Sequence, residues 1–417
     1  MTSIANSVIF FKRHIRNLMD DALCLYTRIR FCKHRRRSQG AKVVAVSITD
    51  ARIFSVEEAI IRLNELPGVD VVAVFHDFGT TSSDAIAREL RASLIKRLTQ
   101  AGLRVVDASG NGSRGDAIRS FAVATVIITN LPYRSRDRAF NAWRYPAKLV
   151  YLPYTLRVFR LHDLAPKSKL TRRSGVAILE SDWHLADYRL SCPDAKLLAV
   201  VGGFPRILHA ESVTPNPAFQ KFAGCKIVLW APHFRSLETP ENILYTTQLA
   251  QKLISLLSAR RNTHLLFRPH PLFEQRLGNV DENNPVHTVL QELLGLNHVS
   301  RADGESVADL FSLIHVAVHN SGSFTAELVA AGKPTVFTQL PNDYIINSLT
   351  SFGWLCMRGA QIVCDAQTAT ASVSDILDGH DSLREVRNEV RNEVRAMTGL
   401  NSMEILLREV ALLLEHK

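Results

Sequence analysis

From residue 42 onward, the chain alternates short, continuous apolar runs with segments whose apolar residues recur every three or four positions. Lys42–Ile48 is a run of the first kind and predicts a strand buried on both faces of a sheet. Ser55–Leu66 is a segment of the second kind; it opens with a Ser-x-x-Glu capping box and predicts a helix. The same patterns predict strands at 71–75, 103–107, 125–129 and 148–152, and helices near 83–100 and from about 116.

A second series of the same kind follows a loop that contains Pro215 and Pro217. Its first strand is Lys226–Pro232, and Ala199–Arg206 is expected to be the exit from the first series. Strands that alternate with helices predict parallel sheets covered on both faces, so we expect two doubly wound α/β domains of the Rossmann type that face a cleft. The further elements expected are helices at 240–259, 306–313 and 324–331 and strands at 263–267, 315–319 and 334–338.

A length of 417 residues suits two domains of roughly 150–200 residues each. We expect one domain at 41–210 and a second at 225–400. Residues 1–40 form a basic amphipathic segment, and 401–417 are expected to form a C-terminal helix. The repeat of Glu-Val-Arg-Asn within 385–395 predicts a structural helix with Glu and Arg on neighbouring faces.

Charge is concentrated at the start of the chain. Residues 1–40 carry nine Lys and Arg against two Asp, which is most of the net charge of +10. Aromatic and aliphatic residues lie between these cations, a pattern typical of segments that bind anionic membrane surfaces. A solvated tail or a helix packed on the body are the alternatives. Nucleic acid ranks last, because no nucleic-acid-binding module follows.

Several classes of protein are disfavoured. No apolar run approaches the roughly 18 residues of a membrane-spanning helix, and the start of the chain does not have the order of a signal peptide. The six cysteines are scattered without a Cys-x-x-Cys pair, which favours reduced thiols over disulfides or zinc. We therefore expect a cytoplasmic protein, attached peripherally to the inner face of the membrane, without a metal or a cofactor.

The strand expected at 263–267 leads into Arg268-Pro-His-Pro271. Arg268 offers a planar fork of donors that matches phosphate oxygens, and His270 can donate a hydrogen bond or carry a positive charge. The alternative is a structural salt bridge or cap at a strand end. Because the segment lies at the carboxyl end of a strand upstream of a second polar turn, we interpret Arg268 as a phosphate ligand and His270 as a catalytic residue.

The second polar turn is Asn320-Ser-Gly-Ser, which leads into a helix. Free N–H groups at a helix start bind phosphate. Ser323 is the expected N-cap, Gly322 permits close approach of a ligand, and Ser321 and Asn320 add polar contacts. Glu327, one turn further on, is placed to accept hydrogen bonds from a ribose. A plain helix cap is the alternative.

Three other strand ends carry polar residues. His233 and Arg235 follow the strand 226–232 and are candidates for donor binding, with a surface loop as the alternative. His76 and Asp77 follow the strand 71–75, and together they can act as a general base toward an acceptor hydroxyl. Asp50 is a further candidate base.

These motifs together resemble a known family. Trp230–Pro232, Arg268–Pro271, the Asn-Ser-Gly-Ser turn, a downstream Gly-Lys-Pro334 and Val201–Arg206 are similar to segments of the CDP-glycerol glycerophosphotransferases of teichoic-acid and capsule synthesis. The resemblance implies the two-domain fold called GT-B, with the domain at 41–210 on the acceptor side and the domain at 225–400 binding a nucleotide-activated donor. It also implies that His270 lies near the diphosphate of the donor and that Arg268 and Ser321–Ser323 bind phosphate.

The sequence departs from the family at two positions. Leu152-Pro-Tyr-Thr155 stands where the family has a His-Gly pair thought to act as the base, and the Asp that precedes the serine turn is replaced. The function expected is a transferase that moves a polyol phosphate from a CDP-activated donor to a hydroxyl of a lipid-linked surface polymer. The alternatives are a glycosyltransferase that uses a nucleotide sugar, a sugar-nucleotide epimerase, and a degenerate transferase that serves as a scaffold.

Overall fold

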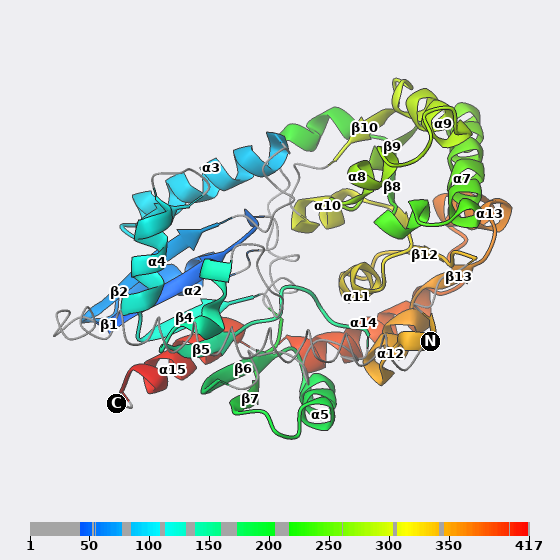
Figure 1. Cartoon of the computed structure of the whole chain (residues 1–417). Coiled ribbons are helices and arrows are strands. Elements are labelled where there is room, and N and C mark those ends of the chain that lie inside the picture. Colours follow the sequence, from blue (N-terminus) through cyan, green and yellow to red (C-terminus); the bar gives the residue numbers. More distant parts are fainter. Residues whose placement is uncertain are drawn as a thin grey trace, which may run out of the picture.

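The chain folds into two parallel sheets, each covered by helices, as Figure 1 shows. The expected α/β fold with two doubly wound domains is therefore confirmed. The basic segment 1–40 and Asp77 lie outside the described residues. The computed structural model describes residues 42–51, 54, 56–76, 85–108, 113–130, 138–159, 173–204, 217–260, 262–302, 307–341, 346–399 and 401–415.

The first sheet has seven strands in the order β3-β2-β1-β4-β5-β6-β7, and every neighbouring pair is parallel. Its strands are β1 (Lys42–Ile48), β2 (Val69–Phe75), β3 (Arg104–Asp107), β4 (Val126–Thr129), β5 (Lys148–Tyr151), β6 (Gly175–Leu179) and β7 (Leu197–Val201). The helices between them are α2 (Glu57–Asn64), α3 (Ala85–Gln100), α4 (Arg114–Val123) and α5 (Asp182–Ser191).

Alternate side chains of each strand enter cores on opposite faces of this sheet. In β1, Val44 and Val46 pack in the core that contains residues of α2 and α3. Val43 and Ala45 point the other way, into the core that contains residues of α4 and α5. Because both faces of the strands are buried, their sequences are continuously apolar.

The second sheet has six parallel strands in the order β10-β9-β8-β11-β12-β13. They are β8 (Lys226–Ala231), β9 (Thr263–Phe267), β10 (Val299–Arg301), β11 (Val316–His319), β12 (Thr335–Thr338) and β13 (Gln361–Val363). The helices are α7 (Pro240–Ala259), α8 (Phe273–Leu277), α9 (Pro285–Leu294), α10 (Val307–Leu313), α11 (Gly322–Ala330), α12 (Ser351–Arg358), α13 (Ala366–Leu377), α14 (Arg384–Thr398) and α15 (Ser402–Glu415).

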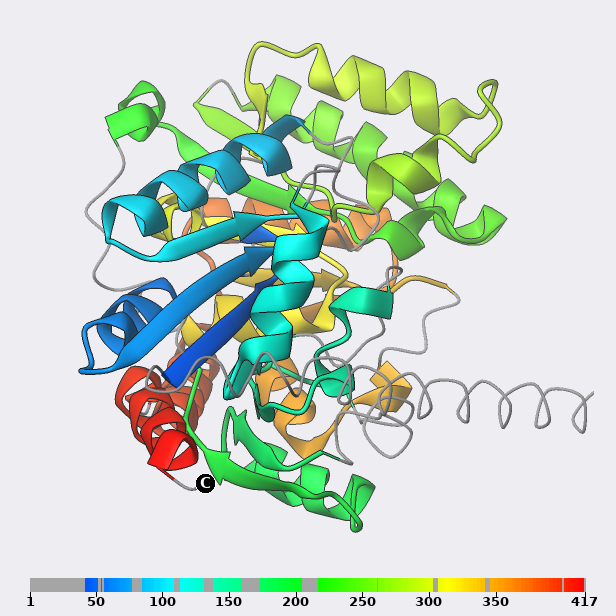
Figure 2. The same cartoon turned by 60° about the vertical axis from the view of Figure 1, so that its left-hand side comes forward.

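The last helix, α15, does not stay with the second sheet. Its Leu406, Val410 and Leu414 are buried in the core that holds β1 and α2 of the first domain. Figure 2 shows α15, in red, beside the strands of the first sheet. An ion pair of 2.9 Å between Arg62 of α2 and Glu404 of α15 lies at the edge of this contact.

Two further contacts join the domains. The segment after β5 meets the loop before α12, where the N–H of Thr350 donates to the carbonyl of Val158 at 2.9 Å. The N–H of Phe204, after β7, donates to the carbonyl of Thr398 at the end of α14, at 2.8 Å. No helix in the described ranges is long and apolar enough to cross a membrane.

Elements with a clear local signal match their predicted bounds. β1, β9 and α7 match to the residue, and α7 begins where Thr239 accepts a hydrogen bond from the N–H of Asn242 at 3.3 Å and Pro240 follows. Gly332 has φ 69°, as its predicted place after α11 requires. The capping box predicted for α2 is not described at Ser55, and α2 instead has Val56 as N-cap, without a side-chain hydrogen bond.

Candidate functional site

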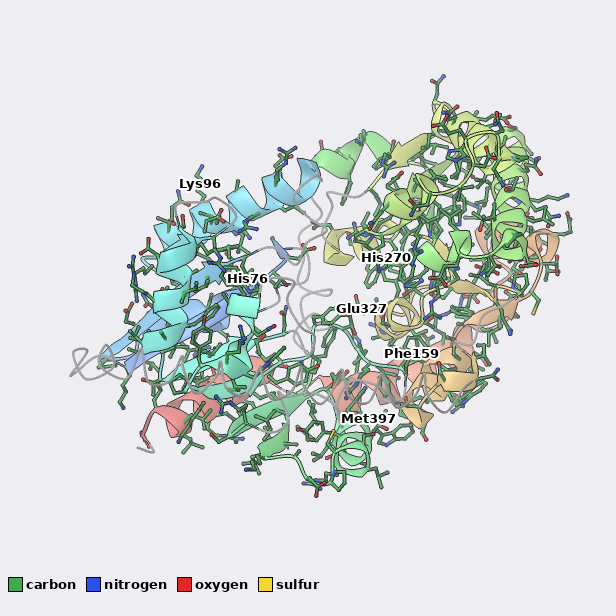
Figure 3. The ribbon with its side chains drawn as sticks, in the orientation of Figure 1. His76, Lys96, Phe159, His270, Glu327 and Met397 are labelled. Atoms are coloured by element: carbon green, nitrogen blue, oxygen red, sulfur yellow. The ribbon has the colours of Figure 1, made fainter. Side chains whose placement is uncertain are left out.

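Three neighbouring strands of the second sheet, β9, β8 and β11, end side by side. Because they are parallel, the segments that follow them meet at one edge of the sheet. These segments carry nearly all of the donor-side residues expected from the sequence. In Figure 3, His270 and Glu327 of the second domain and His76 of the first lie toward the middle of the molecule.

The loops after β8 and β9 bring two histidines together. The ring centroids of His233 and His270 are 4.7 Å apart, and Phe234 lies 4.2 Å from His233 and 5.0 Å from His270. The backbone joins the loops as well, because the N–H of His270 donates to the carbonyl of Pro232 at 2.9 Å. The structure thus places His233 and His270 in one cluster.

The hydrogen bonds define the proton positions on these rings. Nδ1 of His270 accepts from the N–H of Leu272 at 3.1 Å, and Nδ1 of His233 accepts from the N–H of Arg235 at 3.5 Å. A neutral imidazole that accepts at Nδ1 carries its proton on Nε2. Burial lowers the pKa of His233 to about 2, with further lowering by His270 and Arg235. His233 therefore stays neutral, whereas His270 presents an Nε2–H donor.

Two hydrogen bonds hold Arg268 in place, one from its backbone and one from its side chain. Its backbone N–H donates to the carbonyl of Trp230 at 2.9 Å, which continues the ladder between β9 and β8. Its Nη1 donates to the carbonyl of Ala302, after β10, at 2.6 Å. This contact holds one side of the guanidinium group at the sheet edge, beside the loop that carries His270.

Asn320 has a role within the protein. Its side chain is 2% exposed; Oδ1 accepts from the N–H of His233 at 2.7 Å, and Nδ2 donates to the hydroxyl of Ser236 at 2.9 Å. Both ends of the amide are thus used to join the loop after β8 to the end of β11. Ser236, a partner that the sequence did not reveal, completes this clamp.

The start of α11 differs from the prediction in one respect. Its N-cap is Ser321 rather than Ser323, and the side chain of Ser321 makes no capping hydrogen bond. Ser323 is the second residue of the helix. The first N–H groups of α11 are therefore not satisfied by the hydroxyl of the N-cap, which suits a helix start that binds an anion. Glu327, within α11, is 8% exposed.

Gly322 is explained by packing between the domains. A Cβ atom at this position would lie 2.3 Å from Cζ of Phe159 and 2.9 Å from Cγ2 of Val158. Both neighbours belong to the segment after β5 of the first domain. Gly322, which was expected to allow the close approach of a ligand, instead allows the close approach of Val158 and Phe159 of the first domain. Figure 3 shows Phe159 below Glu327 on this side.

His319 is a residue to which the sequence gave no role. It ends β11 with 0% exposure, and its ring lies between Phe324 and Phe337, at centroid distances of 5.4 and 5.7 Å. Its Nδ1 accepts from the N–H of Ser321 at 3.2 Å, and burial lowers its pKa to about 3. The neutral ring therefore fixes the residue that caps α11. A histidine at the very end of a predicted strand, just before the serine turn, was the available signal.

In the first domain, His76 follows β2 and is 1% exposed. Its Nε2 lies 2.8 Å from the hydroxyl of Ser47, and its ring stacks on Phe140 with centroids 4.6 Å apart. The ring of His76 is thus enclosed, with the hydroxyl of Ser47 beside its Nε2. Among the described residues, no three His, Cys, Asp or Glu side chains gather so that they could hold a metal ion.

Comparisons with known proteins agree with this fold. No protein-family model matches the sequence, and no curated protein matches it. Among solved structures, the wall teichoic acid polymerase TagF aligns over 99% of this chain and 98% of its own, with a TM-score of 0.61 and 12% identity. MnaA of S. aureus, solved with UDP, covers 90% of this chain and 98% of its own, with a TM-score of 0.60 and 13% identity.

A UDP-GlcNAc 2-epimerase from Neisseria meningitidis, bound to UDP-GlcNAc, has a TM-score of 0.56 at 12% identity over 89% of this chain and 99% of its own. At such identities the likeness concerns the fold. It defines the chain as a protein with two Rossmann-type domains of the GT-B kind.

Proposed function

We propose that this protein is a GT-B transferase that moves a polyol phosphate from a CDP-activated donor to a hydroxyl of a lipid-linked surface-polymer precursor. The observation that carries the proposal is the position of Arg268 and His270 after β9 and of α11 after β11, at the same edge of the sheet and on either side of β8. Guanidinium groups and free helix N–H groups are ligands for phosphate.

The electrostatics of the site suit a diphosphate. His270 offers an Nε2–H donor, because its Nδ1 already accepts from Leu272. Arg268 adds a fixed positive charge at the same edge. Hydrogen-bond donors and positive charges that are in place before the reaction stabilise the charge that develops on a leaving phosphate, because they need not reorganise during the reaction. Glu327 is assigned to the ribose of the donor.

In the proposed reaction, the acceptor oxygen forms a bond to the phosphorus of the polyol phosphate. The bridging P–O bond to the nucleotide phosphate breaks, and CMP leaves with the electron pair. Arg268 and the Nε2–H of His270 stabilise the oxygen that leaves. The acceptor proton passes to a base of the first domain, for which we propose His76 together with Asp77.

The similarity to TagF supports the choice of a polyol phosphate, because that protein's name describes a wall teichoic acid polymerase. The sequence motifs shared with glycerophosphotransferases support the same choice. The basic segment 1–40 is proposed to bring the protein to an anionic membrane surface, where a lipid-linked acceptor is found.

A second candidate function is a sugar-nucleotide epimerase, because MnaA with UDP and the epimerase with UDP-GlcNAc have the same fold. An epimerase converts its nucleotide sugar without an acceptor, so analysis of products from UDP-GlcNAc alone separates it from a transferase. A glycosyltransferase would instead need both a nucleotide sugar and an acceptor. A scaffold would bind a nucleotide without turnover.

The test is a thermal-shift titration against CDP-glycerol, other CDP-linked donors, UDP-GlcNAc, GDP-sugars and CMP-sugars. A ligand at a hundredfold excess over its dissociation constant stabilises a protein by about 2.7 kcal/mol. A rise in melting temperature with one CDP-linked compound, absent in His270→Ala, is the expected result. A shift with UDP-GlcNAc alone would favour the epimerase, and no shift with any nucleotide would overturn the enzyme proposals.

A further inference from the structure

The first sheet has a pocket between β1 and β4, where the direction of strand order reverses. In a doubly wound sheet this reversal opens a crevice at the carboxyl ends of the strands, and ligands bind there. The pocket has a volume of about 20 Å³, enough for one or two small groups. It lies in the first domain and is separate from the donor cluster around His270.

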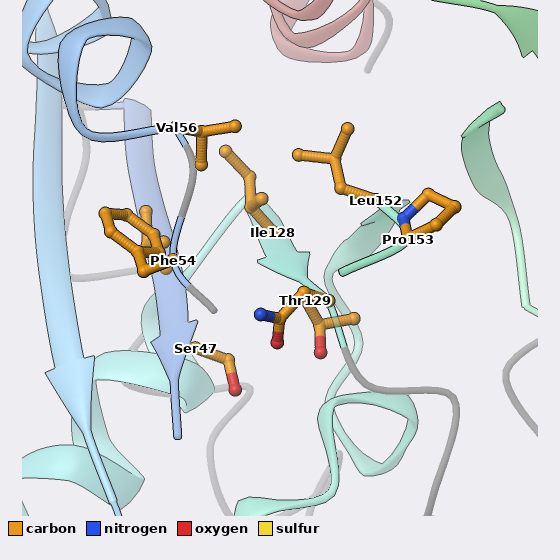
Figure 4. A pocket seen from close by; sticks show the side chains of 9 residues that line it. Ser47, Phe54, Val56, Ile128, Thr129, Leu152 and Pro153 are labelled. Carbon is orange, nitrogen blue, oxygen red and sulfur yellow. The ribbon is translucent and has the colours of Figure 1, made fainter. Parts of the chain in front are cut away.

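The pocket has a polar side and an apolar side. Ser47 of β1, Thr129 of β4 and Asn130 provide the polar side, and Phe54, Val56 and Leu152 are among the apolar residues that face it. Figure 4 shows the hydroxyls of Ser47 and Thr129 on one side and the side chains of Val56 and Leu152 on the other. A CH2–OH group matches this division, because its carbon suits the apolar side and its hydroxyl suits the polar side.

Ser47 connects the pocket to the buried histidine. Ser47 is one of the residues that line the pocket, and its hydroxyl lies 2.8 Å from Nε2 of His76. The ring of His76 is fixed by the stack on Phe140 and by its backbone N–H, which donates to the carbonyl of Ile48 at 3.0 Å. A hydroxyl that faces a pocket, with an imidazole behind it, can pass a proton from the pocket to the imidazole.

Asn130 favours a ligand that brings a second hydrogen-bond donor. Its Oδ1 is buried and has no hydrogen-bond partner among the described residues. A buried carbonyl oxygen without a partner is destabilising, so a ligand that supplies a hydrogen-bond donor at this point is favoured. A polyol or sugar, with hydroxyls on neighbouring carbons, places one at Ser47 and another at Asn130. A simple alcohol cannot do both.

We propose that this pocket binds the reacting CH2–OH end of a polyol or sugar acceptor, and that Ser47 relays its proton to His76. The inference deepens the proposed function and rests on it. Ser47 contacts the acceptor hydroxyl, and His76 acts through Ser47. Asn130 selects an acceptor with a second hydroxyl.

The relay balances with the transfer reaction. As the acceptor oxygen forms its bond to the donor phosphorus, its proton moves to Oγ of Ser47. The proton of Ser47 moves at the same time to Nε2 of His76, which must be the unprotonated nitrogen of the neutral ring. The bridging P–O bond breaks, and CMP leaves with the electron pair. Ser47 ends the step as a hydroxyl, and His76 ends it as an imidazolium that later releases its proton to water.

The pocket is tested without any donor by NMR of the full chain labelled with 15N in its histidine side chains. The signals of His76 are those missing from His76→Asn. Glycerol is the probe. Its binding beside Ser47 is expected to shift the Nε2 signal of His76 in a saturable way, and Val56→Phe, which fills the apolar side, is expected to prevent the shift. Two results overturn the site. One is a His76 shift that never saturates with glycerol; the other is a His76 shift equal to that of His287 in the same protein and to that of His76 in Val56→Phe. Both show binding as an adventitious additive only.

The relay is tested by turnover of CDP-glycerol with glycerol as acceptor. Ser47→Ala is expected to lower kcat by about 100-fold or more, with an unchanged dissociation constant for the donor, whereas Ser47→Thr keeps a hydroxyl and retains kcat within about tenfold. A merely structural serine would show no such rescue, and full kcat in Ser47→Ala overturns the relay. A saturable His76 shift in a protein that binds no nucleotide supports the polyol site and overturns the proposed function; an active protein without the shift overturns the site alone.

Discussion

The rings of His233 and His270 lie with their centroids 4.7 Å apart, on loops that follow two adjacent parallel strands. Their proximity makes it unfavourable for both to carry a charge, and His270 is one of the groups that lower the pKa of His233. The two rings therefore differ: His233 remains neutral and packs, while His270 presents the Nε2–H donor that we propose for the phosphates.

The first prediction concerns His270. In His270→Ala, turnover of the nucleotide-activated donor is expected to fall by about 100-fold or more, because one preformed hydrogen-bond donor to the leaving phosphate is lost. The free energy of unfolding should change by about 1 kcal/mol at most, since the ring is only half-buried. Steady-state kinetics and urea unfolding measure the two effects. His287→Ala, at a half-buried histidine of α9, is the matched control, and equal activities of the two variants would contradict the role of His270.

The second prediction concerns the amide of Asn320. Asn320→Ala leaves the N–H of His233 and the hydroxyl of Ser236 without their partner, so the free energy of unfolding should fall by about 1–3 kcal/mol. Donor affinity should fall as well, because the loop after β8 loses its connection to β11. Urea unfolding and a donor titration check this. Asn283→Ala, at an exposed asparagine, should leave both quantities unchanged; a similar loss there would refute the clamp.

The third prediction separates packing from ligand approach at Gly322. Gly322→Ala should destabilise the protein by about 1–3 kcal/mol, because the new Cβ would lie 2.3 Å from Cζ of Phe159. Adding Phe159→Ala should relieve this overlap, so that the double variant is more stable than the sum of the single effects predicts. Unfolding measurements on all four proteins complete the cycle. If the changes in the free energy of unfolding of the two single variants add strictly in the double variant, the new methyl group does not clash with Phe159.

The fourth prediction is a pH dependence of stability that arises from His319. Its pKa is lowered from 6.5 to about 3 in the folded protein. As the pH falls below 6.5, the unfolded chain takes up a proton that the folded chain does not, so stability is lost. Between pH 7 and pH 5 the loss from one such histidine is about 2 kcal/mol. His319→Gln should therefore lose less stability over this interval than the wild type, measured by urea unfolding at both pH values. Parallel losses would contradict the assignment.

The fifth prediction concerns the basic segment 1–40. A chain that begins at Ala41 should no longer sediment with vesicles that contain anionic lipid, because it lacks nine of the Lys and Arg side chains. Its donor-induced thermal shift should equal that of the full chain. Vesicle sedimentation and the thermal shift are measured on the same preparations. Unchanged sedimentation would show that the membrane is bound elsewhere.

The fold was predictable where the signal is local. Continuous apolar runs such as β9, and helix starts such as Thr239-Pro240, depend on residues that are neighbours in sequence. The sequence patterns do not predict β6, α5 or β7, and they assign part of β7 to an exit loop because Gly202 and Gly203 follow that strand directly. The gathering of strand ends followed from parallel topology alone.

The details of the site were less predictable, because they depend on contacts between distant residues. The Asn-Ser-Gly-Ser turn contains several possible N-caps. The hydrogen bond from the N–H of Ser321 to Nδ1 of His319 is part of the reason why Ser321, and not Ser323, is the N-cap. The reason for Gly322 lies 163 positions away, at Phe159, and no spacing rule connects them. The burial of His76 behind Ser47 likewise depends on the pairing of β1 with β2.

The return of α15 to the first sheet affects how the gene can be divided. The first domain needs residues from both ends of the chain, since Leu406, Val410 and Leu414 complete a core that begins at β1. A single cut between the two strand series therefore yields an amino-terminal fragment with an exposed apolar groove and a carboxyl-terminal fragment with an unattached amphipathic helix. We expect the first fragment to aggregate alone and to be rescued in trans by a synthetic peptide of residues 401–417.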